Sequence, residues 1–345
     1  MKIVRNICFL FVGFVVISTS LCSQNQSDSA FVEKVRKWEN FVSKMPKFSG
    51  FVNARYQWGD NLSSFDIRRV RLSVTGDINK MFDYKMQIEF MSPKILDAYA
   101  RVKIKPYFSV QAGQFKVPFS IESAYSPLTM ECADNSLAIS KLVGYSDLSG
   151  ISANGRDIGV MIYGSAGKMT SKRGKDFYVF NYSVGIFNGN GINIKDRNLN
   201  KDVVGRININ PLKDLTISAS GYYGSYYAND STQYATRNRA SAGILYDDQK
   251  LLIRGEYTHG WTNKVESYGF NAVAAYTFIK KLQPILRFDY FKENILQQEV
   301  QMNYTASFKY LIVKNFGLQI SYTYQTFKDK SKNSGLLDLV MIASF

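Results

Sequence analysis

Two stretches near the C-terminal end of the chain alternate strictly between apolar and polar residues. From residue 316 to 325 every second residue is Phe, Leu, Ile or Tyr, and the residues between them are Gly, Gln, Ser or Thr. After a polar break at 328–334, the alternation resumes and ends on the terminal Phe345. A period of two predicts β-strands with one apolar and one polar face. The aromatic residues near the strand ends favour strands whose apolar face contacts lipid.

The same pattern recurs backwards along the chain to Phe48. It predicts an all-β fold, a 16-stranded antiparallel transmembrane β-barrel in which both ends of the barrel domain lie on the periplasmic side. The predicted strands cover residues 48–58, 64–78, 81–91, 95–104, 107–116, 156–165, 176–187, 201–210, 214–224, 236–247, 250–260, 267–279, 282–292, 298–310, 315–327 and 335–345.

The lengths of the connections agree with this topology. Connections after even-numbered strands are mostly tight, whereas several after odd-numbered strands are long, above all 117–155 and 188–200. Short turns on one side and long loops on the other are typical of outer-membrane barrels. The connection 166–175 is longer than this rule allows. Closure of the sheet would give every backbone N–H and C=O a partner, as a strand in lipid requires.

The first residues of the chain have the pattern of a secretory signal peptide. Lys2 and Arg5 precede an apolar stretch at 7–17, which is followed by small polar residues. The stretch is shorter than the ~20 residues that a membrane-spanning helix needs. Cleavage is expected after Cys22 or one residue later, which makes 1–22 the signal peptide. Acylation of Cys22 is an alternative, although Leu21 stands where a small residue is wanted.

Residues 23–47 form a predicted periplasmic segment ahead of the barrel domain at 48–345. Apolar residues recur there at helical spacing and indicate a short amphipathic N-terminal helix. Packing on the periplasmic rim of the barrel and binding to a partner are both open interpretations. The apolar positions are Phe31, Val35, Trp38, Val42 and Met45.

Cysteine and histidine are scarce. Without the signal peptide Cys132 stands alone, and His259 is the only histidine. This composition excludes a disulfide framework and the common histidine-rich metal and catalytic sites. We therefore predict no enzyme, no catalytic residue, no metal and no cofactor. A barrel hydrolase, or a binding or adhesion barrel with little conductance, is the alternative class, and conductance separates it from a channel.

Charge changes the picture of the barrel interior. The formal net charge is +15, and it falls by two with the loss of Lys2 and Arg5. If the apolar face of each strand contacts lipid, the basic residues face inward, since Arg or Lys at mid-bilayer costs ~2 to 4 kcal/mol. The lumen is then polar, net basic and anion-favouring. The inward basic residues outside the second strand are Arg55, Lys85, Arg101, Lys103, Arg206, Arg239, Arg254, Arg287 and Lys309.

Ion pairs along the wall are the competing role for each of these arginines. The expected pairs are Arg254 with Glu256, Arg287 with Asp289, and Arg101 with Asp97. The acids are too few to neutralise the whole group.

Five motifs follow one another in the first half of the barrel domain. They are FDIRRVRLSVTG at 65–76, then FDYKMQIEF, LDAYARVKI and AGQFKVPFSIES, and finally GRDIGVMIYG at 155–164. In this order they resemble the phosphate-selective porin O and P family of bacterial outer-membrane porins. The resemblance implies a homotrimeric channel in outer-membrane lipid that passes small anions such as phosphate, with no role for nucleic acid. It also implies a constriction where the third loop, about 117–154, folds into the barrel. The terminal Phe345 resembles the signal read by barrel-insertion machinery.

The resemblance also implies anion-binding residues. The arginines of the family's second strand, its lysine near the third loop and its opposing aspartate correspond to Arg68, Arg69, Lys116 and Asp97. Arg71 and Arg101 are their neighbours. Asp97 is expected to moderate anion binding by competing for the same arginines. The third loop is mixed in charge, which favours general anion selectivity over a dedicated phosphate site. A β-bulge is required near Ile67 if Ile67 and Val70 both face lipid.

Overall fold

A computed structural model of the chain describes residues 36, 45–60, 62–151, 153–196, 199–227, 234–279 and 281–345. The predicted signal peptide, and the predicted N-terminal helix apart from Arg36 and residues 45–47, lie outside the described residues. The chain divides into two units, Met1–Met45 and Pro46–Phe345, and the second unit is the barrel. No helix in the described part of the chain is both long enough and apolar enough to cross a membrane.

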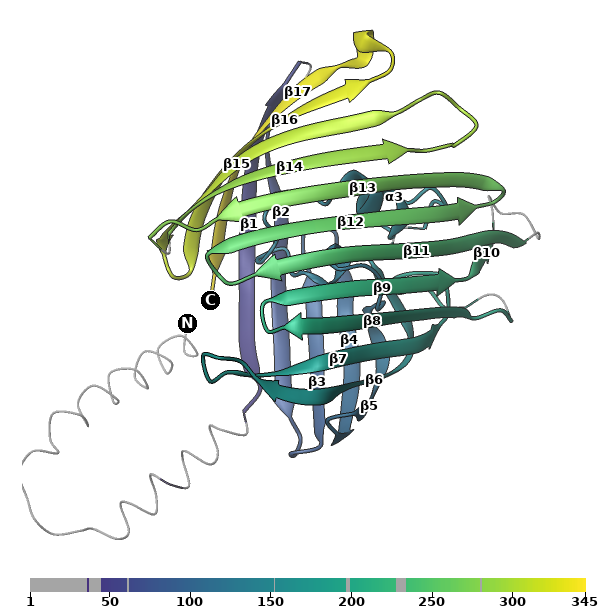
Figure 1. Ribbon diagram of the computed structural model, residues 1–345, viewed down its shortest axis with the longest axis vertical. Helices are drawn as coiled ribbons and strands as arrows, with labels where there is room; N and C mark the ends of the chain where they lie inside the picture. Colours follow the sequence, from purple (N-terminus) through teal and green to yellow (C-terminus); the bar gives the residue numbers. More distant parts are fainter. Residues whose placement is uncertain are drawn as a thin grey trace, which may run out of the picture. The chain divides into compact units, whose positions relative to one another are not determined.

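The barrel is a single antiparallel sheet (Figure 1). β9 and β10 are separated only at Gly224 and both pair with β11, so they form one barrel strand. The described residues therefore contain sixteen barrel strands, as predicted. The bounds are β1 (Lys47–Gly59), β2 (Leu62–Asp77), β3 (Phe82–Glu89), β4 (Lys94–Lys105), β5 (Phe108–Lys116), β6 (Arg156–Thr170), β7 (Asp176–Phe187), β8 (Asp202–Leu212), β9 (Leu215–Tyr223), β10 (Ser225–Tyr227), β11 (Tyr234–Asp247), β12 (Leu251–Thr262), β13 (Val265–Tyr276), β14 (Leu282–Lys292), β15 (Gln301–Val313), β16 (Phe316–Phe327) and β17 (Ser334–Ser344).

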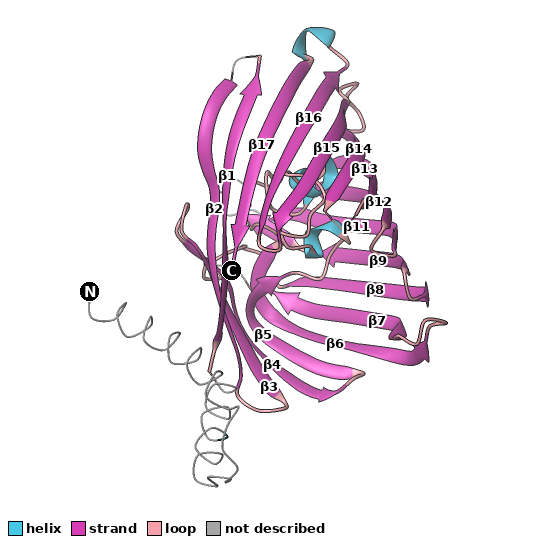
Figure 2. Cartoon of the chain, turned by 90° about the vertical axis from the view of Figure 1, so that its left-hand side faces the viewer, coloured by secondary structure: helices cyan, strands magenta, loops and turns pink. Residues whose placement is uncertain are grey.

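The first and last strands close the sheet. β1 pairs with β2 on one side and with β17 on the other, where Phe51 lies opposite Ser344. Beyond β17, the backbones of Gly50 and Phe345 exchange hydrogen bonds of 3.2 and 3.0 Å. Figure 2 shows β1, β2 and β17 side by side. The closed sheet has no free edge, which is the condition for strands to lie in lipid.

Two details of the strands bear on the predictions. β6 continues to Thr170, so its connection to β7 spans only 171–175, and the expected long connection at 166–175 is wrong. The register of β2 against β1 shifts between Asn53 and Ala54, which leaves Arg68 as an extra residue. The bulge reverses the alternation at this point, so Ile67 lies on the outer face although Arg69 faces the interior.

Elsewhere the alternation places apolar residues outside and polar residues inside. On β14, Leu286 is 65% exposed on the lipid-facing side, whereas Arg287 and Asp289 are buried in the interior. The same holds for Phe308 and Ser307 on β15. The inside of the barrel is therefore the polar side of the sheet.

The long segment 117–155 between β5 and β6 lies inside the barrel. It contains the short helices η1 (Glu122–Ala124) and α3 (Leu137–Leu142), which Figure 2 shows surrounded by strands. α3 contacts β12, β13 and β14. We call this segment the third loop.

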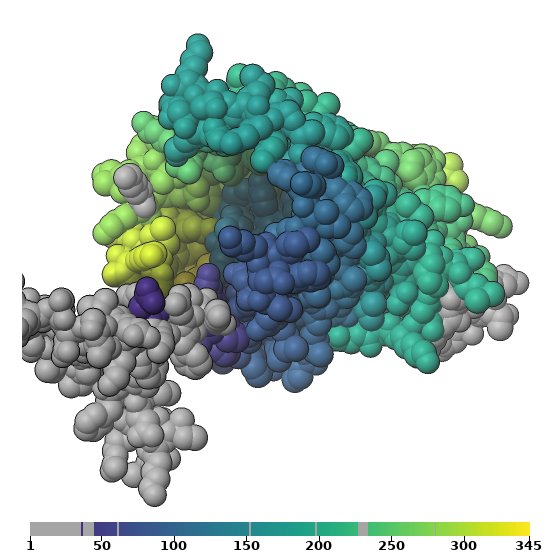
Figure 3. Space-filling view, turned by 90° about the horizontal axis from the view of Figure 1, so that it is seen from below, coloured from purple at the N-terminus to yellow at the C-terminus, as the bar shows by residue number. Residues whose placement is uncertain are grey.

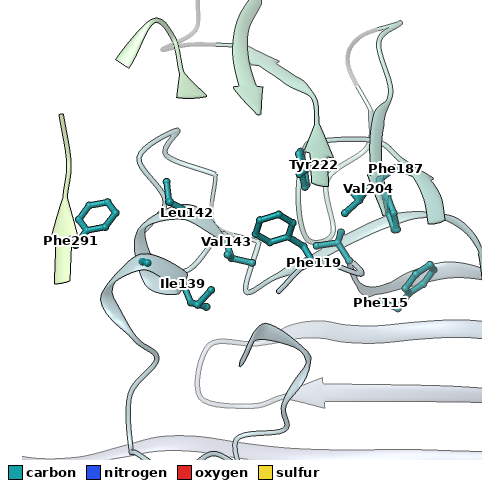
Figure 4. Packing of buried hydrophobic residues seen from close by; sticks show 11 residues of the cluster. Phe115, Phe119, Ile139, Leu142, Val143, Phe187, Val204, Tyr222 and Phe291 are labelled. Carbon is teal, nitrogen blue, oxygen red and sulfur yellow. The ribbon is translucent and has the colours of Figure 1, made fainter. Parts of the chain in front are cut away.

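A hydrophobic cluster fixes the third loop against the wall. Phe119, Ile139 and Leu142 of the loop are at most 2% exposed. Figure 4 shows Phe119 beside Tyr222 of β9, and their rings meet edge to face at 6.4 Å. Burial of these side chains holds the loop inside the barrel by the hydrophobic effect.

Candidate functional site: the lumen and its third loop

Glu256 on β12 binds the start of the third loop. Its carboxylate accepts hydrogen bonds from the backbone N–H of Ile121 at 2.7 Å and of Glu122 at 3.2 Å. Arg206 on β8 donates to the carbonyl of Ser120 at 2.7 Å. Glu256 is 3% exposed, so its charge is balanced by these N–H groups and nearby arginines instead of by water.

Arg254, two residues before Glu256, points at the same loop. Its guanidinium forms ion pairs with Glu122 at 3.0 Å and with Glu131 at 3.1 Å. It also lies 5.1 Å from the ring centre of Tyr125. The expected pair between Arg254 and Glu256 is wrong, because each of the two side chains has its partners in the third loop.

Three more inward side chains hold backbone carbonyls of the third loop. Arg287 donates to Asp134 at 2.6 Å, Lys309 to Met130 at 2.6 Å, and Gln319 to Glu131 at 2.7 Å. Arg287 also forms the expected ion pair with Asp289, at 2.9 Å. Arg287 and Lys309, two of the predicted lumen residues, thus bind the third loop.

Asp147, near the end of the third loop, joins it to β11. Its carboxylate pairs with Arg237 at 3.5 Å and Arg239 at 3.3 Å, and Arg239 also donates to the carbonyl of Leu142 at 3.2 Å. Burial alone raises the pKa of Asp147, but attraction to the two arginines outweighs burial and holds the pKa below its ordinary value. The carboxylate therefore stays ionised near neutral pH.

The opposite wall, β2 to β6, carries the predicted anion-binding residues. Arg68 donates to the carbonyl of Ala133 and pairs with Asp134, and Arg71 pairs with Glu89 at 2.8 Å. The ammonium of Lys116 donates to the carbonyls of Ser123, at 2.7 Å, and of Tyr125. Arg68 and Lys116 thus bind the third loop from this side.

Asp97 is paired differently from the prediction. It binds Arg156 at 2.7 Å and Lys85 at 2.8 Å, while Arg101 pairs with Asp83 at 2.6 Å. The expected Arg101–Asp97 pair is therefore wrong. The expected competition of Asp97 for the β2 arginines has no contact to support it. Among the other predicted lumen residues, Lys103 pairs with Asp83, and Arg55 pairs with Asp66 and Asp338.

Arg156 is a site residue that the sequence analysis missed. It is the first residue of β6, directly after the third loop, and it is 4% exposed. The GRD motif at 155–157 contained the signal, but alternation along the predicted strand 156–165 places Arg156 on the face of Val160 and Ile162, which is the lipid-facing one. Its charge adds to those of Lys85 and Lys116 at one place on the wall.

Among the described residues, two sizeable cavities lie between the wall and the third loop. The outer cavity, of about 200 Å³, is lined by residues toward the long-loop side, such as Ser92 and Asn154. The inner cavity, of about 640 Å³, extends toward the short-turn side of the barrel, where Gly164 and Ser165 of β6 line it. Both cavities include Lys116, Pro127 and Arg156 in their lining. Figure 3 shows the molecule hollowed between strands coloured blue, teal and yellow.

Basic residues dominate the lining of the two cavities. Nine basic and two acidic side chains contribute to it. In the part of the chain that the structure describes, Arg69 and Lys94 are the lining cations whose side chains make no hydrogen bond or ion pair. The basic residues are Arg68, Arg69, Arg71, Lys85, Lys94, Arg101, Lys116, Arg156 and Arg206, and the acids are Glu89 and Asp97.

The only histidine lies outside the lumen. His259 is on the lipid-facing side of β12, where its ring centre lies 4.3 Å from that of Trp261 with the two planes tilted by 31°. Its Nδ1 lies 2.9 Å from the hydroxyl of Tyr257 and its Nε2 lies 2.7 Å from the carboxylate of Glu266. These contacts place His259 in an aromatic surface patch and away from the cavities.

Comparisons with known proteins agree with the barrel. The anion-selective porin from Comamonas acidovorans superposes with a TM-score of 0.67 at 11% identity, covering 87% of this chain and 99% of that chain. OmpF of Salmonella typhi, in complex with daunomycin, gives 0.62 at 12% identity, with 88% and 99% covered. OmpT of Vibrio cholerae, in its trimer form, gives 0.60 at 11%, with 87% and 99% covered. At these identities the likeness shows the fold alone.

The family follows from the sequence itself. A comparison with curated protein sequences finds no significant match. The profile of the family described as phosphate-selective porin O and P matches residues 48–246, more than half of the chain. This chain belongs to the phosphate-selective porin O and P family and is an outer-membrane porin, a non-enzymatic channel.

Proposed function

We propose that this porin is a water-filled, anion-favouring diffusion channel, narrowed by the third loop. The observation that carries the proposal is the lining of the two cavities, with nine basic and two acidic side chains. Basic walls with few acids attract anions and repel cations. The selectivity comes from the lining as a group, since most single charges are paired.

The narrowest part of the path lies where the two cavities meet. Lys116 and Arg156 belong to the wall there, and Pro127 belongs to the third loop. The carbonyls that Lys116 binds lie just before Pro127, so Lys116 positions the loop edge that faces Arg156. In this proposal Lys116 sets the width of the channel, and the Arg156–Asp97–Lys85 group sets the charge on its wall.

The outer cavity is the proposed binding site for a small anion such as phosphate. Arg69 and Lys94 are available to donate charge-assisted hydrogen bonds, each worth ~1.5 to 3 kcal/mol net. Two such bonds, offset in part by dehydration of the anion, give about 4 kcal/mol, which is millimolar affinity. That affinity is strong enough for entry and weak enough for exit. Arg68 and Arg71 add positive charge beside this site although both are ion-paired.

Assembly and export complete the proposal. A homotrimer is supported by the trimer form of the similar OmpT structure. Export through a cleaved signal peptide at 1–22 is the route that the N-terminal sequence supports. We also infer that the terminal Phe345, which is 69% exposed, is read by the barrel-insertion machinery.

The test is conductance of the purified protein in a planar bilayer with phosphate titrated into KCl. The proposal expects stable ohmic steps and a reduction of the KCl current at millimolar phosphate. Steps without reduction by phosphate would leave a general anion channel. A protein that inserts without conducting would instead support the binding or adhesion barrel.

A further inference from the structure

The inner cavity has an aromatic floor as well as a basic rim. Tyr99 on β4 lies opposite Gly113 on β5, which in turn lies opposite Gly159 on β6. Gly159 leaves room for the ring of Phe187 on β7, which meets the ring of Phe115 edge to face at 5.5 Å. The ring of Phe115 in turn packs edge to face on Tyr99 at 5.9 Å. The floor therefore presents a tyrosine that is supported by a row of aromatic rings.

A second tyrosine lies in line with an arginine on the same wall. Tyr163 on β6 is opposite Ser183 on β7, and Ser183 is opposite Arg206 on β8. Neighbouring strands are about 4.8 Å apart, so Tyr163 and Arg206 are separated by about 10 Å across one small residue. The guanidinium of Arg206 binds a loop carbonyl and has no carboxylate within ion-pair distance among the described residues. All three side chains line the inner cavity.

The size of the inner cavity does not match a bare inorganic anion. Its volume of about 640 Å³ corresponds to about twenty water molecules. Small-molecule sites of roughly 300 to 1,000 Å³ typically combine apolar or aromatic walls with a few polar groups. Tyr99, Phe115, Met161 and Tyr163 provide such walls here. The outer cavity, at about 200 Å³, has only Tyr125 and Tyr145 as aromatic residues and more arginines.

We propose that the inner cavity is a binding site for organic anions that carry a flat ring, such as aryl phosphates. The ring packs on Tyr99 and Tyr163, and the anionic group lies at Arg206 and the neighbouring basic residues. This inference rests on the proposed anion channel, because the same basic lining admits the solute. The ring site would make the channel prefer phosphates that carry an aromatic ring over phosphates without one, a distinction that the phosphate site in the outer cavity does not make.

Phenyl phosphate and methyl phosphate test this proposal, because they share the charged group and differ in the ring. Each is titrated into KCl in a planar bilayer, and the concentration that halves the current is measured. An aromatic contact of ordinary strength lowers the half-blocking concentration of phenyl phosphate about three- to tenfold relative to methyl phosphate. Replacing both tyrosines, Tyr99→Ala with Tyr163→Ala, removes the difference.

Two further variants guard against a change of fold. Tyr163→Phe keeps the ring and should keep the preference for phenyl phosphate. Tyr304→Ala removes an exposed tyrosine from the outer face of β15 and should leave both half-blocking concentrations unchanged.

The outcomes separate the two proposals. Cation preference in KCl overturns the anion channel itself. Anion preference with equal block by phenyl and methyl phosphate overturns the ring site and leaves the channel proposal standing. A preference for phenyl phosphate that survives the double tyrosine variant also overturns the ring site.

Discussion

The Nε of Arg156 lies 2.7 Å from Oδ1 of Asp97, and both side chains are almost fully buried. The pair joins the end of the third loop to the wall of the barrel at β4. Lys85 approaches the other carboxylate oxygen at 2.8 Å. Asp97 therefore balances one of the two cations with which it pairs, and one positive charge is left over beside the inner cavity.

Asp97→Asn should strengthen block by phosphate. The substitution keeps the size of the side chain but leaves the charges of Arg156 and Lys85 unbalanced beside the path. A severalfold lower half-blocking phosphate concentration is expected in planar bilayers. The matched variant Arg156→Gln should act in the opposite direction, because it removes the positive charge that is left over and leaves Asp97 balanced by Lys85 alone. Equal block by wild type and Asp97→Asn would show that this pair does not act on the permeating anion.

Lys116→Met separates positioning from direct binding. The ammonium binds the carbonyls of Ser123 and Tyr125, so its loss should release this edge of the third loop and increase the size and noise of single-channel steps. If Lys116 were only an anion ligand, phosphate block would weaken while conductance in KCl stayed nearly the same. Lys168→Met, which removes an exposed lysine near the short-turn end of β6, is the control.

Arg254→Met should destabilise the folded barrel. The substitution leaves Glu122 and Glu131 buried without their cation, and uncompensated buried charge costs about 3 to 5 kcal/mol. Thermal unfolding in detergent, followed by the loss of the β-strand signal in circular dichroism, measures the effect. The variant should unfold at a lower midpoint temperature than the wild-type protein. Arg173→Met, in the exposed turn before β7, should leave the midpoint unchanged. Equal midpoints for all three proteins would mean that Arg254 does not hold the loop.

The attachment of the third loop through Asp147 should persist in mild acid. Arg237 and Arg239 hold the pKa of Asp147 below its ordinary value. The stabilisation that these ion pairs give to the loop is therefore complete above about pH 4, and it is lost only as the pH falls further, through the lowered pKa. This contact should therefore cause no change in the single-channel conductance step between pH 7 and about pH 5. Asp147→Asn should alter the step size already at neutral pH. A wild-type change above pH 5 that Asp147→Asn abolishes would contradict the assignment.

The fold was predictable because one rule governs each strand. Leu286 and Arg287 are adjacent in sequence, and the cost of a charge in lipid decides which of them faces out. Arg206, Arg254 and Lys309, which the same rule predicts to face inward, all contact the third loop. The bulge at Arg68 also followed from this rule. Ile67 and Val70 are three residues apart and would lie on opposite faces of a regular strand, but both are apolar, so a bulge is needed to turn both toward lipid.

The pairing of the inward charges was not predictable. Arg254 and Glu256 share one face of a strand, and nothing in their spacing shows that a distant loop supplies better partners to both. Glu256 binds backbone N–H groups of residues 121 and 122, and backbone donors leave no mark in the sequence. Arg156 was overlooked for a related reason, because its direction depends on where the third loop ends.

The reversal potential across a KCl gradient tests the basic lumen most directly. The account predicts a potential whose sign shows preference for chloride, and a smaller preference in a variant that combines Arg69→Gln with Lys94→Gln. These two cations line the outer cavity and make no ion pair with any residue that the structure describes, so their removal changes the charge of the cavity with little effect on the loop. A reversal potential showing preference for potassium in the wild-type protein would contradict the account.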